Sequence, residues 1–437
     1  MAEVVVAKFG GSSLADADQF AKVKAIITSA PEKRRFVVPS APGKRHSDDH
    51  KVTDLLLMCH QLSDHNIDFT EVFQMISERY HAIADQLELE LDLDAKLNEV
   101  AEAIAVGASR HWVASRGEYL NGLILAEYLG YEFVDPATLI AFTEAEEYDA
   151  PTTMSQIAAR LKNQKNAVIP GFYGADLNGN VITFSRGGSD ITGSIIAAGL
   201  DADLYENWTD VSGFLKADPR IVDQPRPIEV VTYKELRELS YMGASVLHEE
   251  AIFPVREKGI PIRILNTNRA EDPGTLIVDD RAEVEFRGIT GIAGRKDFTV
   301  ISLEKTLMDD ENGFFRRLVS VFETNNVSIA HMPSGIDTVS VIVASEDIRF
   351  KLNKVVEEIK IYCRPDTVSI ESGISLIAVV GRGMVRTAGI AGRVFTALAK
   401  AQVNIRMITQ GASEMSIIVG VSNDDFKTAV RAIYEDA

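Results

Sequence analysis

The chain has 437 residues and 46% hydrophobic content, which suffices to bury substantial cores in about two or three domains. Its formal net charge of −19 argues against nucleic acid or an anionic membrane surface as a partner, because both require a basic footprint. No apolar run approaches the roughly 18 residues of a membrane span, no basic N-terminal stretch indicates export, and Cys59 and Cys363 lack metal-type spacing, so we expect a cytoplasmic protein with reduced, buried thiols.

The first predicted element is a strand over residues 4–7, which runs into the sequence Lys-Phe-Gly-Gly-Ser-Ser at residues 8–13. Four apolar residues bounded by glycines favour a strand buried on both faces. A helix is predicted to follow, with Ser13 as its cap and Asp16 in its first turn. Glycines that allow close backbone approach, next to a helix start and Lys8, indicate an anion site. The alternative is a plain strand-to-helix turn with a solvated lysine.

A second strand is predicted within residues 35–43, and it ends in a Pro/Gly loop. The polar continuation over residues 44–54 favours a mobile flap at an active site, with an ordinary solvated loop as the alternative. Residues 55–127 carry a helical pattern. Within that pattern, a glycine, Gly117, interrupts the run of helix-favouring residues beside the carboxylate of Glu118.

Strand and helix patterns then alternate, with strands predicted at residues 131–134, 166–172 and 181–184. This alternation indicates an α/β fold with a doubly wound, mainly parallel sheet. The third of these strands runs into a second glycine-rich turn, residues 185–193, before a helix of small residues. Ligands of open α/β sheets bind beyond the carboxyl ends of the strands, so we expect the two glycine-rich turns to face one crevice. A purely structural turn is the alternative.

Two aspartate-containing turns follow at residues 209–213 and 217–220, and a strand at residues 261–267 is predicted to close this part of the chain. His248 lies at a predicted helix end near apolar residues. We interpret it as a structural histidine rather than a catalytic one.

The C-terminal third contains an internal repeat. Gly313 matches Gly389 and Val327 matches Val403, each pair 76 residues apart (389 − 313 and 403 − 327). Both copies show the strand, helix, strand, strand, helix order of a ferredoxin-like unit. We expect a catalytic domain at 1–285 and a regulatory region at 286–437, with the first repeat at about 299–374 and the second at about 375–437. The second copy lacks a strand, so the spare strand 288–294 is predicted to complete it, with the first copy inserted.

Five motifs in order, at residues 8–13, 186–190, 209–211, 218–220 and 243–248, together resemble the aspartokinase family. The likeness covers essentially the whole chain, including the repeats, which resemble tandem ACT domains of the monofunctional type. It implies an amino-acid-kinase-type fold plus two ferredoxin-like ACT repeats. It also implies ATP-dependent phosphorylation of the side-chain carboxylate of L-aspartate to 4-phospho-L-aspartate, with Mg²⁺. The resemblance implies a place in aspartate-family amino-acid or ectoine biosynthesis.

The resemblance also assigns roles to residues. Lys8 contacts the transferring phosphoryl group, Asp190 orients Lys8 and helps to hold the Mg-nucleotide, and Arg186 pairs with an aspartate carboxylate. The implied nucleotide-binding residues are Lys8, Gly10, Gly11, Ser12, Thr209, Asp210, Asp218, Arg220, Ser245 and Val246. The implied substrate-binding residues are Thr53, Glu118, Arg186, Gly187, Gly188 and Ser189, with Glu118 accepting the ammonium. No metal site built from protein ligands alone is predicted.

Two positions depart from the family pattern. Ser245 stands where the family often has lysine, so a basic contact to the nucleotide is missing or comes from elsewhere. Glu249 stands where proline is usual after His248, which is expected to affect local geometry only.

The resemblance further suggests feedback control through an amino acid such as lysine or threonine, bound at a strand-to-helix turn of the first repeat. The expected effector-binding residues are Met308, Asp309, Asn312, Gly313, Phe314, Phe315, Ser328 and Ile329. Repeats that only dimerise the enzyme are the alternative. Exposed sheet edges favour a homodimer or a larger homo-oligomer. Other functions left open are a kinase of the same fold acting on another amino acid and a catalytically silent amino-acid sensor.

Overall fold

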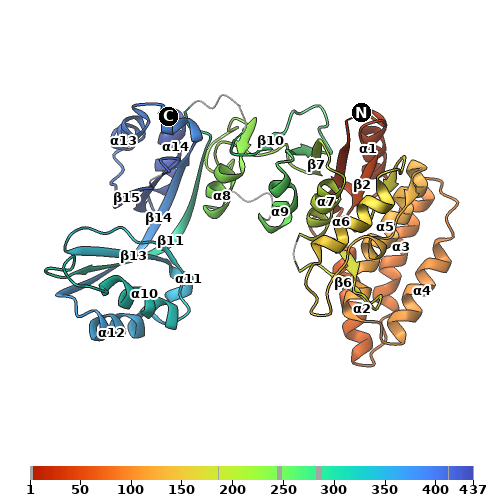
Figure 1. Cartoon of the computed structure of the whole chain (residues 1–437), viewed down its shortest axis with the longest axis horizontal. Coiled ribbons are helices and arrows are strands. Elements are labelled where there is room, and N and C mark those ends of the chain that lie inside the picture. The colour runs from red at the N-terminus through yellow and green to blue at the C-terminus, as the bar shows by residue number, and fades with distance from the viewer. Residues whose placement is uncertain (1–2, 186, 244–248, 282–287, 412, 437) are drawn as a thin grey trace. The chain divides into compact units, whose positions relative to one another are not determined.

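The computed structural model describes residues 3–185, 187–243, 249–281, 288–411 and 413–436 (Figure 1). The chain forms two compact units. The first unit comprises Met1–Phe214, Pro227–Tyr233 and Val246–Glu283, and the second unit comprises Leu215–Arg226, Lys234–Ser245 and Val284–Ala437. The boundary predicted between 285 and 286 lies outside the described residues and stays a prediction.

The first unit is built on an 8-stranded sheet in the order β3-β4-β2-β1-β7-β9-β10-β8. Strands β3 to β9 in this order run parallel, whereas β10 is antiparallel to β9. The strands are β1 (Val5–Phe9), β2 (Phe36–Pro39), β3 (Glu132–Phe133), β4 (Ala167–Val168), β7 (Leu204–Thr209), β8 (Val230–Thr232), β9 (Ile262–Asn266) and β10 (Thr275–Val278). The predicted α/β class with a doubly wound, mainly parallel sheet is confirmed.

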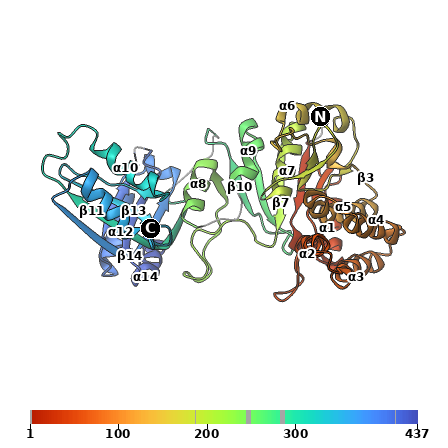
Figure 2. The same cartoon turned by 90° about the horizontal axis from the view of Figure 1, so that it is seen from below.

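The helices of the first unit are α1 (Ala17–Thr28), α2 (Val52–Asp64), α3 (Thr70–Gln86), α4 (Leu93–Ala105), α5 (Arg110–Leu129), α6 (Ala150–Leu161), α7 (Gly188–Gly199) and α9 (Glu249–Lys258). Helix α8 (Tyr233–Tyr241) belongs to the second unit except for Tyr233. Short 3₁₀ turns are η1 (Gly11–Leu14) and η2 (Pro136–Thr138). Figures 1 and 2 show α3 and α4 as an outer layer, separated from β7 by α5. Among the described residues, no helix combines the length and the apolar character needed to cross a membrane.

The side chains of β1 alternate between the two faces of the sheet, and each face packs against a different layer of helices. Ala7 and Phe9 belong to the core formed with α1 to α5, and the Phe9 ring stacks on Trp208 at 5.9 Å. Because successive side chains of a strand point to opposite faces, Lys8 lies on the other face. That face is covered by α7, which packs so closely that a Cβ on Gly193 would lie 2.7 Å from the ring of Tyr205.

The first helix starts later than predicted. Residues 11–14 form the short turn η1, and α1 begins at Ala17 with Asp16 as its N-cap, where the carboxylate accepts a hydrogen bond from the amide of Gln19. Ser13 is not the cap. It is buried, and its hydroxyl hydrogen-bonds to that of Thr267 at 2.7 Å. A carboxylate favours a helix start at least as well as a hydroxyl, which explains why Asp16 takes this position.

The strand predicted at 181–184 does not join the main sheet. Strand β6 (Val181–Thr183) pairs antiparallel with β5 (Tyr173–Ala175) in a separate two-stranded ribbon. The second glycine-rich turn therefore leaves a hairpin rather than a central strand. It still leads into α7, which covers β1 and β7.

The second unit contains a 6-stranded antiparallel sheet in the order β12-β13-β11-β14-β16-β15. Its elements are β11 (Gly291–Glu304), α10 (Phe314–Thr324), β12 (Ile329–His331), β13 (Thr338–Ala344), α11 (Ser345–Ile348), α12 (Leu352–Tyr362), β14 (Thr367–Val380), η3 (Arg382–Arg386), α13 (Ile390–Lys400), β15 (Met407–Gln410), β16 (Ser416–Ser422) and α14 (Phe426–Asp436). Figure 1 shows β11 and β14 as the long central strands.

Both long strands serve both repeats. Gly291–Arg295 pairs with Val380–Leu376, next to β16, whereas Phe298–Glu304 pairs with β13 and with Ile374–Thr367. The predicted spare strand is thus the first part of β11, with a register shift separating it from the part in the first repeat. Each repeat has its own core, one around Ile377 and Val419 and one around Ile301 and Val341.

Candidate active site

Lys8, Asp190 and Asn207 form a polar cluster between β1, β7 and the first turn of α7. The Lys8 ammonium lies 2.5 Å from Oδ1 of Asp190 and 3.3 Å from Oδ1 of Asn207. Nδ2 of Asn207 donates to the same Asp190 oxygen at 2.8 Å. The side chains of Lys8 and Asp190 are 8% and 19% exposed, so the ion pair is largely shielded from water on the Lys8 side. The expected contact between Lys8 and Asp190 is therefore present in the structure.

Asn207 is a site residue that the sequence analysis missed. It pairs in register with Lys8 across the parallel strands β1 and β7, which places both side chains on the face toward α7. The signal that could have revealed it is a polar side chain in the middle of a strand that is buried along most of its length.

The glycine turn after β1 lies at the carboxyl edge of the sheet beside the end of β7. The amide of Gly10 donates to the carbonyl of Trp208 at 2.9 Å, which places Thr209 and Asp210 next to the turn. Gly11 is required sterically, because a Cβ there would lie 2.9 Å from the carbonyl oxygen of Ala41. Ser12 is half-buried within η1. The structure thus brings together most of the predicted nucleotide-binding residues of the first unit.

The predicted substrate side of the site is organised around Ala41, in the loop after β2. A Cβ on Gly117 would lie 2.9 Å from the Cβ of Ala41 and 3.6 Å from the hydroxyl of Thr53, so this glycine lets α5 approach both. The next residue, Glu118, is buried, and its Oε2 has no hydrogen-bond partner among the described residues. Ala41 therefore contacts both the phosphate turn, at Gly11, and the helix that carries Glu118.

Burial raises the pKa of Glu118 to about 8, and the backbone amide of Ala41 offsets part of this effect. A buried carboxylate without a cationic partner is costly, and the cost is relieved by protonation or by a bound cation. The orphaned Oε2 is thus chemically suited to an ammonium group.

The second glycine-rich turn closes against the loop that follows β4. A Cβ on Gly188 would lie 2.3 Å from the ring of Phe172, and one on Gly171 would lie 2.6 Å from the side chain of Ser189. Gly187 has a φ of 58°, which favours glycine. Phe172 also has a positive φ, 84°, a strained conformation for a bulky residue of the kind that concentrates at functional sites. Phe172 was not predicted, because strain leaves no pattern in the sequence.

The loop predicted as a mobile flap is anchored at Asp49. The buried guanidinium of Arg79 donates to Asp49 at 2.6 Å and to the carbonyl of Gly43 at 3.0 Å, and Arg45 also donates to Asp49. The hydrogen bond from Arg45 holds the pKa of Asp49 well below its usual range. Gly43 donates in turn to the carbonyl of Gly11, so this loop supports the phosphate turn.

The structure does not bring all of the predicted residues to this site. Four of them fall outside the described residues: Arg186, Ser245, Val246 and His248. Asp218 and Arg220 belong to the second unit, where the Arg220 guanidinium lies 2.7 Å from the Asp218 carboxylate and lowers its pKa. Among the described residues, no group of three or more His, Cys, Asp or Glu side chains could hold a metal ion.

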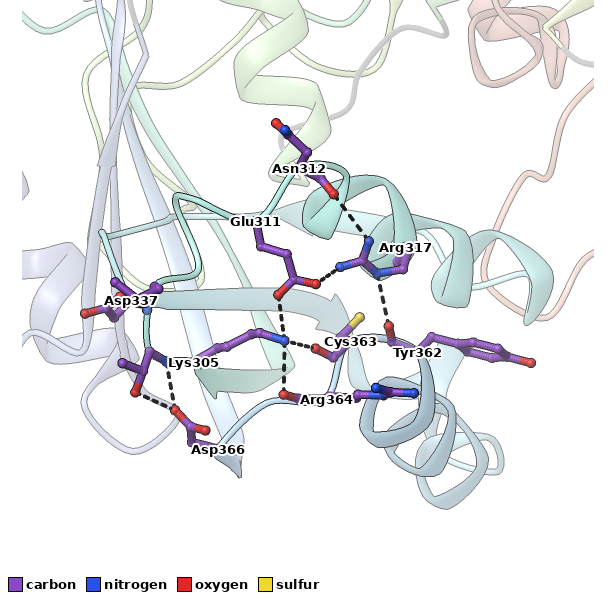
Figure 3. Close-up of polar contacts among 11 residues, drawn as sticks. Lys305, Glu311, Asn312, Arg317, Asp337, Tyr362, Cys363, Arg364 and Asp366 are labelled. Carbon is purple, nitrogen blue, oxygen red and sulfur yellow. Dashed lines mark hydrogen bonds and ion pairs between the residues drawn. The ribbon is translucent and has the colours of Figure 1, made fainter.

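The predicted effector turn precedes α10 in the first repeat. Hydrogen bonds and ion pairs connect this turn to the rest of the repeat (Figure 3). Glu311 lies between two cations, with Lys305 at 2.7 Å and Arg317 in direct contact. Lys305 also donates to the carbonyl of Cys363, and Arg317 donates to that of Tyr362. Glu311 was not among the predicted residues. The predicted residues on the turn and at the adjoining start of α10 are Met308, Asp309, Asn312, Gly313, Phe314 and Phe315, with Ser328 and Ile329 at the start of β12.

Comparisons with known proteins agree with this architecture. Residues 3–266 match the amino acid kinase family, and residues 377–436 match an ACT domain. Aspartokinase 3 of Bacillus subtilis (strain 168) is 39% identical over 446 residues, covering 99% of this chain and 98% of that protein. The crystal structure of Clostridium acetobutylicum aspartate kinase, described as an allosteric enzyme, is 53% identical with a TM-score of 0.92 and 99% coverage of both chains. Escherichia coli aspartokinase III in complex with aspartate and ADP is 25% identical with a TM-score of 0.71 and the same coverage. The chain therefore belongs to the aspartokinases, within the amino acid kinase family.

Proposed function

We propose that the enzyme transfers the γ-phosphoryl group of ATP to the side-chain carboxylate of L-aspartate, giving 4-phospho-L-aspartate and ADP. The observation that carries this proposal is the placement of two groups around Ala41: the glycine turn beside the buried Lys8, and the buried, unpartnered oxygen of Glu118. The first suits an anion, and the second suits a substrate ammonium. Aspartate and ADP bound to the Escherichia coli relative are consistent with this pairing.

The reaction needs little chemistry from the protein. The substrate carboxylate is already ionised at neutral pH, so it attacks the γ-phosphorus without a general base while the bond to the β,γ-bridging oxygen breaks. Catalysis then rests on positioning and on stabilising the charge that shifts during transfer. Lys8 supplies a buried cation for this purpose, and Asp190 keeps its ammonium in place.

On the phosphate side, the turn at Gly10, Gly11 and Ser12 would hold the phosphates through backbone and hydroxyl groups. Thr209 and Asp210 would line the same edge. Mg²⁺ typically binds through one or two carboxylates, water and substrate phosphates, and Asp190 and Asp210 would supply carboxylates at this edge. Asp218 and Arg220 are also proposed to bind the nucleotide, as the family resemblance implies.

On the acceptor side, we assign the substrate ammonium to Glu118 and expect Thr53, Gly187, Gly188 and Ser189 to enclose it. Arg186 is proposed to pair with a carboxylate of the substrate, for which its planar fork is suited.

Regulation is part of the proposal. The turn at residues 308–313, followed by the start of α10, is proposed to bind an amino-acid effector such as lysine or threonine, and the allosteric relative from Clostridium acetobutylicum supports this role. We further propose a cytoplasmic homodimer or larger homo-oligomer, assembled through the ACT repeats. The product is expected to enter aspartate-family amino-acid or ectoine biosynthesis.

The test is formation of aspartyl phosphate from Mg-ATP, trapped as its hydroxamate. We expect product with L-aspartate and much less with L-glutamate or other amino acids. Product with another acid in place of aspartate would reassign the substrate, and no ATP turnover with any acid would favour the silent sensor. Adding lysine and threonine to the same assay, singly and together, tests the effector. An absence of inhibition in all three cases would remove both candidates.

A further inference from the structure

Asn207 lies at the centre of the candidate active site. Core packing does not explain why a polar residue is buried there. It is 2% exposed and lies between β1 and α7, on a strand face that otherwise carries the large ring of Tyr205. These two residues, two apart on β7, both hold Asp190: the Tyr205 hydroxyl donates to its backbone carbonyl at 3.1 Å, and the Asn207 amide donates to its carboxylate. Strand β7 thus fixes both the main chain and the side chain of Asp190.

The orientation of the Asn207 amide follows from its partners. An ionised carboxylate only accepts hydrogen bonds and an ammonium only donates them, so Nδ2 must face Asp190 and Oδ1 must face Lys8. The distances are 2.8 Å and 3.3 Å, respectively. The amide therefore touches both members of the ion pair, and each of its two polar atoms has a partner.

This arrangement affects how Lys8 can act. Lys8 and Asn207 both donate to Oδ1 of Asp190, so the carboxylate charge is shared between two donors. With an apolar residue at position 207, Asp190 and Lys8 would form an isolated buried pair that satisfies itself, because the low local dielectric strengthens such a contact. The ammonium would then be less available to a phosphoryl group.

We propose that Asn207 is a positioning residue for phosphoryl transfer, which orients Lys8 and Asp190 toward the transferring group by hydrogen-bonding to both. The inference rests on the role proposed for Lys8. It predicts an effect on the chemical step, with binding of the acceptor amino acid largely unaffected, because the amide contacts Lys8 and Asp190 rather than the Glu118 side of the site.

The test compares Asn207→Leu and Asn207→Asp with the wild type in the hydroxamate assay. Asn207→Leu is expected to lower kcat by about 10²-fold, as for a comparable misplacement of catalytic groups, while KM for aspartate changes little. Asn325→Leu is the matched control, since Asn325 is also buried and donates through Nδ2 but lies in the other unit. This control is expected to keep the wild-type kcat.

Asn207→Asp gives a result that structural damage would not produce. The new carboxylate would face that of Asp190, so the two would share a proton at low pH, and the protonated group would donate in place of Nδ2. Its kcat should approach the wild-type value at low pH and fall as the shared proton is lost. The pH dependence of kcat is measured on Asn207→Asp alone, so it tests the proposal even if Asn207→Leu does not fold.

Two failures are distinguishable. A wild-type enzyme that forms no aspartyl phosphate overturns the proposed function, and the inference with it. A wild-type enzyme that forms product, together with an Asn207→Asp variant that keeps the wild-type kcat and pH profile, overturns the role of Asn207 alone.

Discussion

The amide of Gly43 donates a 2.8 Å hydrogen bond to the carbonyl of Gly11, so the loop after β2 lies directly against the phosphate turn after β1. A Cβ on either glycine would clash with the backbone of the other segment: it would lie 2.9 Å from the carbonyl oxygen of Ala41 at position 11 and 2.6 Å from the carbonyl carbon of Gly11 at position 43. The guanidinium of Arg79 donates to the carbonyl of Gly43 at 3.0 Å. This close approach joins the two halves of the candidate site.

Gly11→Ala should therefore destabilise the first unit, whereas Gly10→Ala should not. A Cβ on Gly10 would make only ordinary contacts, at 3.5 Å, so the adjacent position serves as the control. We expect a loss of about 1–3 kcal/mol for Gly11→Ala, the usual cost of overpacking. Denaturant unfolding followed by tryptophan fluorescence reports on this unit, because the 2 tryptophans, Trp112 and Trp208, both belong to it. Equal unfolding midpoints for the two variants would contradict the steric role of Gly11.

Lys8→Ala should lower kcat by at least about 10²- to 10³-fold, the range for removing one preorganised electrostatic contact to a transition state. The variant leaves Asp190 without its cation, but this carboxylate is 19% exposed and still accepts a hydrogen bond from Asn207, so we expect a less stable protein that still folds. The hydroxamate assay measures the loss, and Lys162→Ala, which changes an exposed lysine of the same unit, is the control. Near-normal turnover by Lys8→Ala would show that another cation contacts the phosphoryl group.

Much of this arrangement could be predicted, for a physical reason. Lys8 and Asp190 sit beside glycines that follow strand patterns, and a residue next to a strand end is placed at the sheet edge by the strand itself. The internal repeat likewise predicted the paired ferredoxin-like units. Such features depend on local order along the chain.

What could not be predicted depends on which segments meet in space. Strand β6 has three residues and no periodicity that distinguishes the hairpin partner β5 from the main sheet. Ala41 faces Gly11 through its carbonyl oxygen and Gly117 through its Cβ, and neither of these neighbours lies near it in the sequence. Asn207 was missed because it meets Lys8 and Asp190 only through the register between β1 and β7 and the packing of α7. The residues around Asn207 in the sequence predict neither of these.

Glu118→Gln should remove a pH dependence of both substrate binding and stability. With a pKa of about 8, Glu118 is mostly protonated in the free enzyme at neutral pH, so KM for aspartate should fall as pH rises toward 8. Glutamine cannot ionise. The variant should therefore have a higher KM, by about 10²-fold at pH 8 if one charge-assisted contact is lost, and its KM should be flat across this range.

The effect on stability has the opposite sign. Because the folded-state pKa of Glu118 lies above its unfolded value, the stability contributed by its protonated form is complete below about pH 4.5 and is lost as pH rises through about 8. Glu118→Gln should accordingly unfold at higher denaturant concentration than the wild type at pH 9 but not at pH 5. Glu127→Gln, an exposed position on the same helix, is the control. If the difference in unfolding midpoint between the wild type and Glu118→Gln were the same at pH 5 and pH 9, a raised pKa of Glu118 would be ruled out.

Gly294→Ala tests whether the first part of β11 belongs structurally to the second repeat. Gly294 pairs with Ile377, and a Cβ there would lie 2.6 Å from the ring of Phe426 in α14 and 2.9 Å from the carbonyl oxygen of Leu376. We expect the clash to destabilise the second repeat by about 1–3 kcal/mol and to reduce hydrogen-exchange protection in α14 more than in α12 of the first repeat.

Gly392→Ala is the matched control for this substitution, because it also lies in the second repeat, within α13, and a Cβ there meets no atom within 4 Å. Alanine in a helix is favoured over glycine by about 0.5–1 kcal/mol, so this variant should be neutral or more stable. The amides of Val430 and Ile433 report on α14, and those of Val355 and Ile359 report on α12. Equal loss of protection in both helices would mean that the two repeats unfold as one cooperative unit, with the shared strands β11 and β14 transmitting the damage.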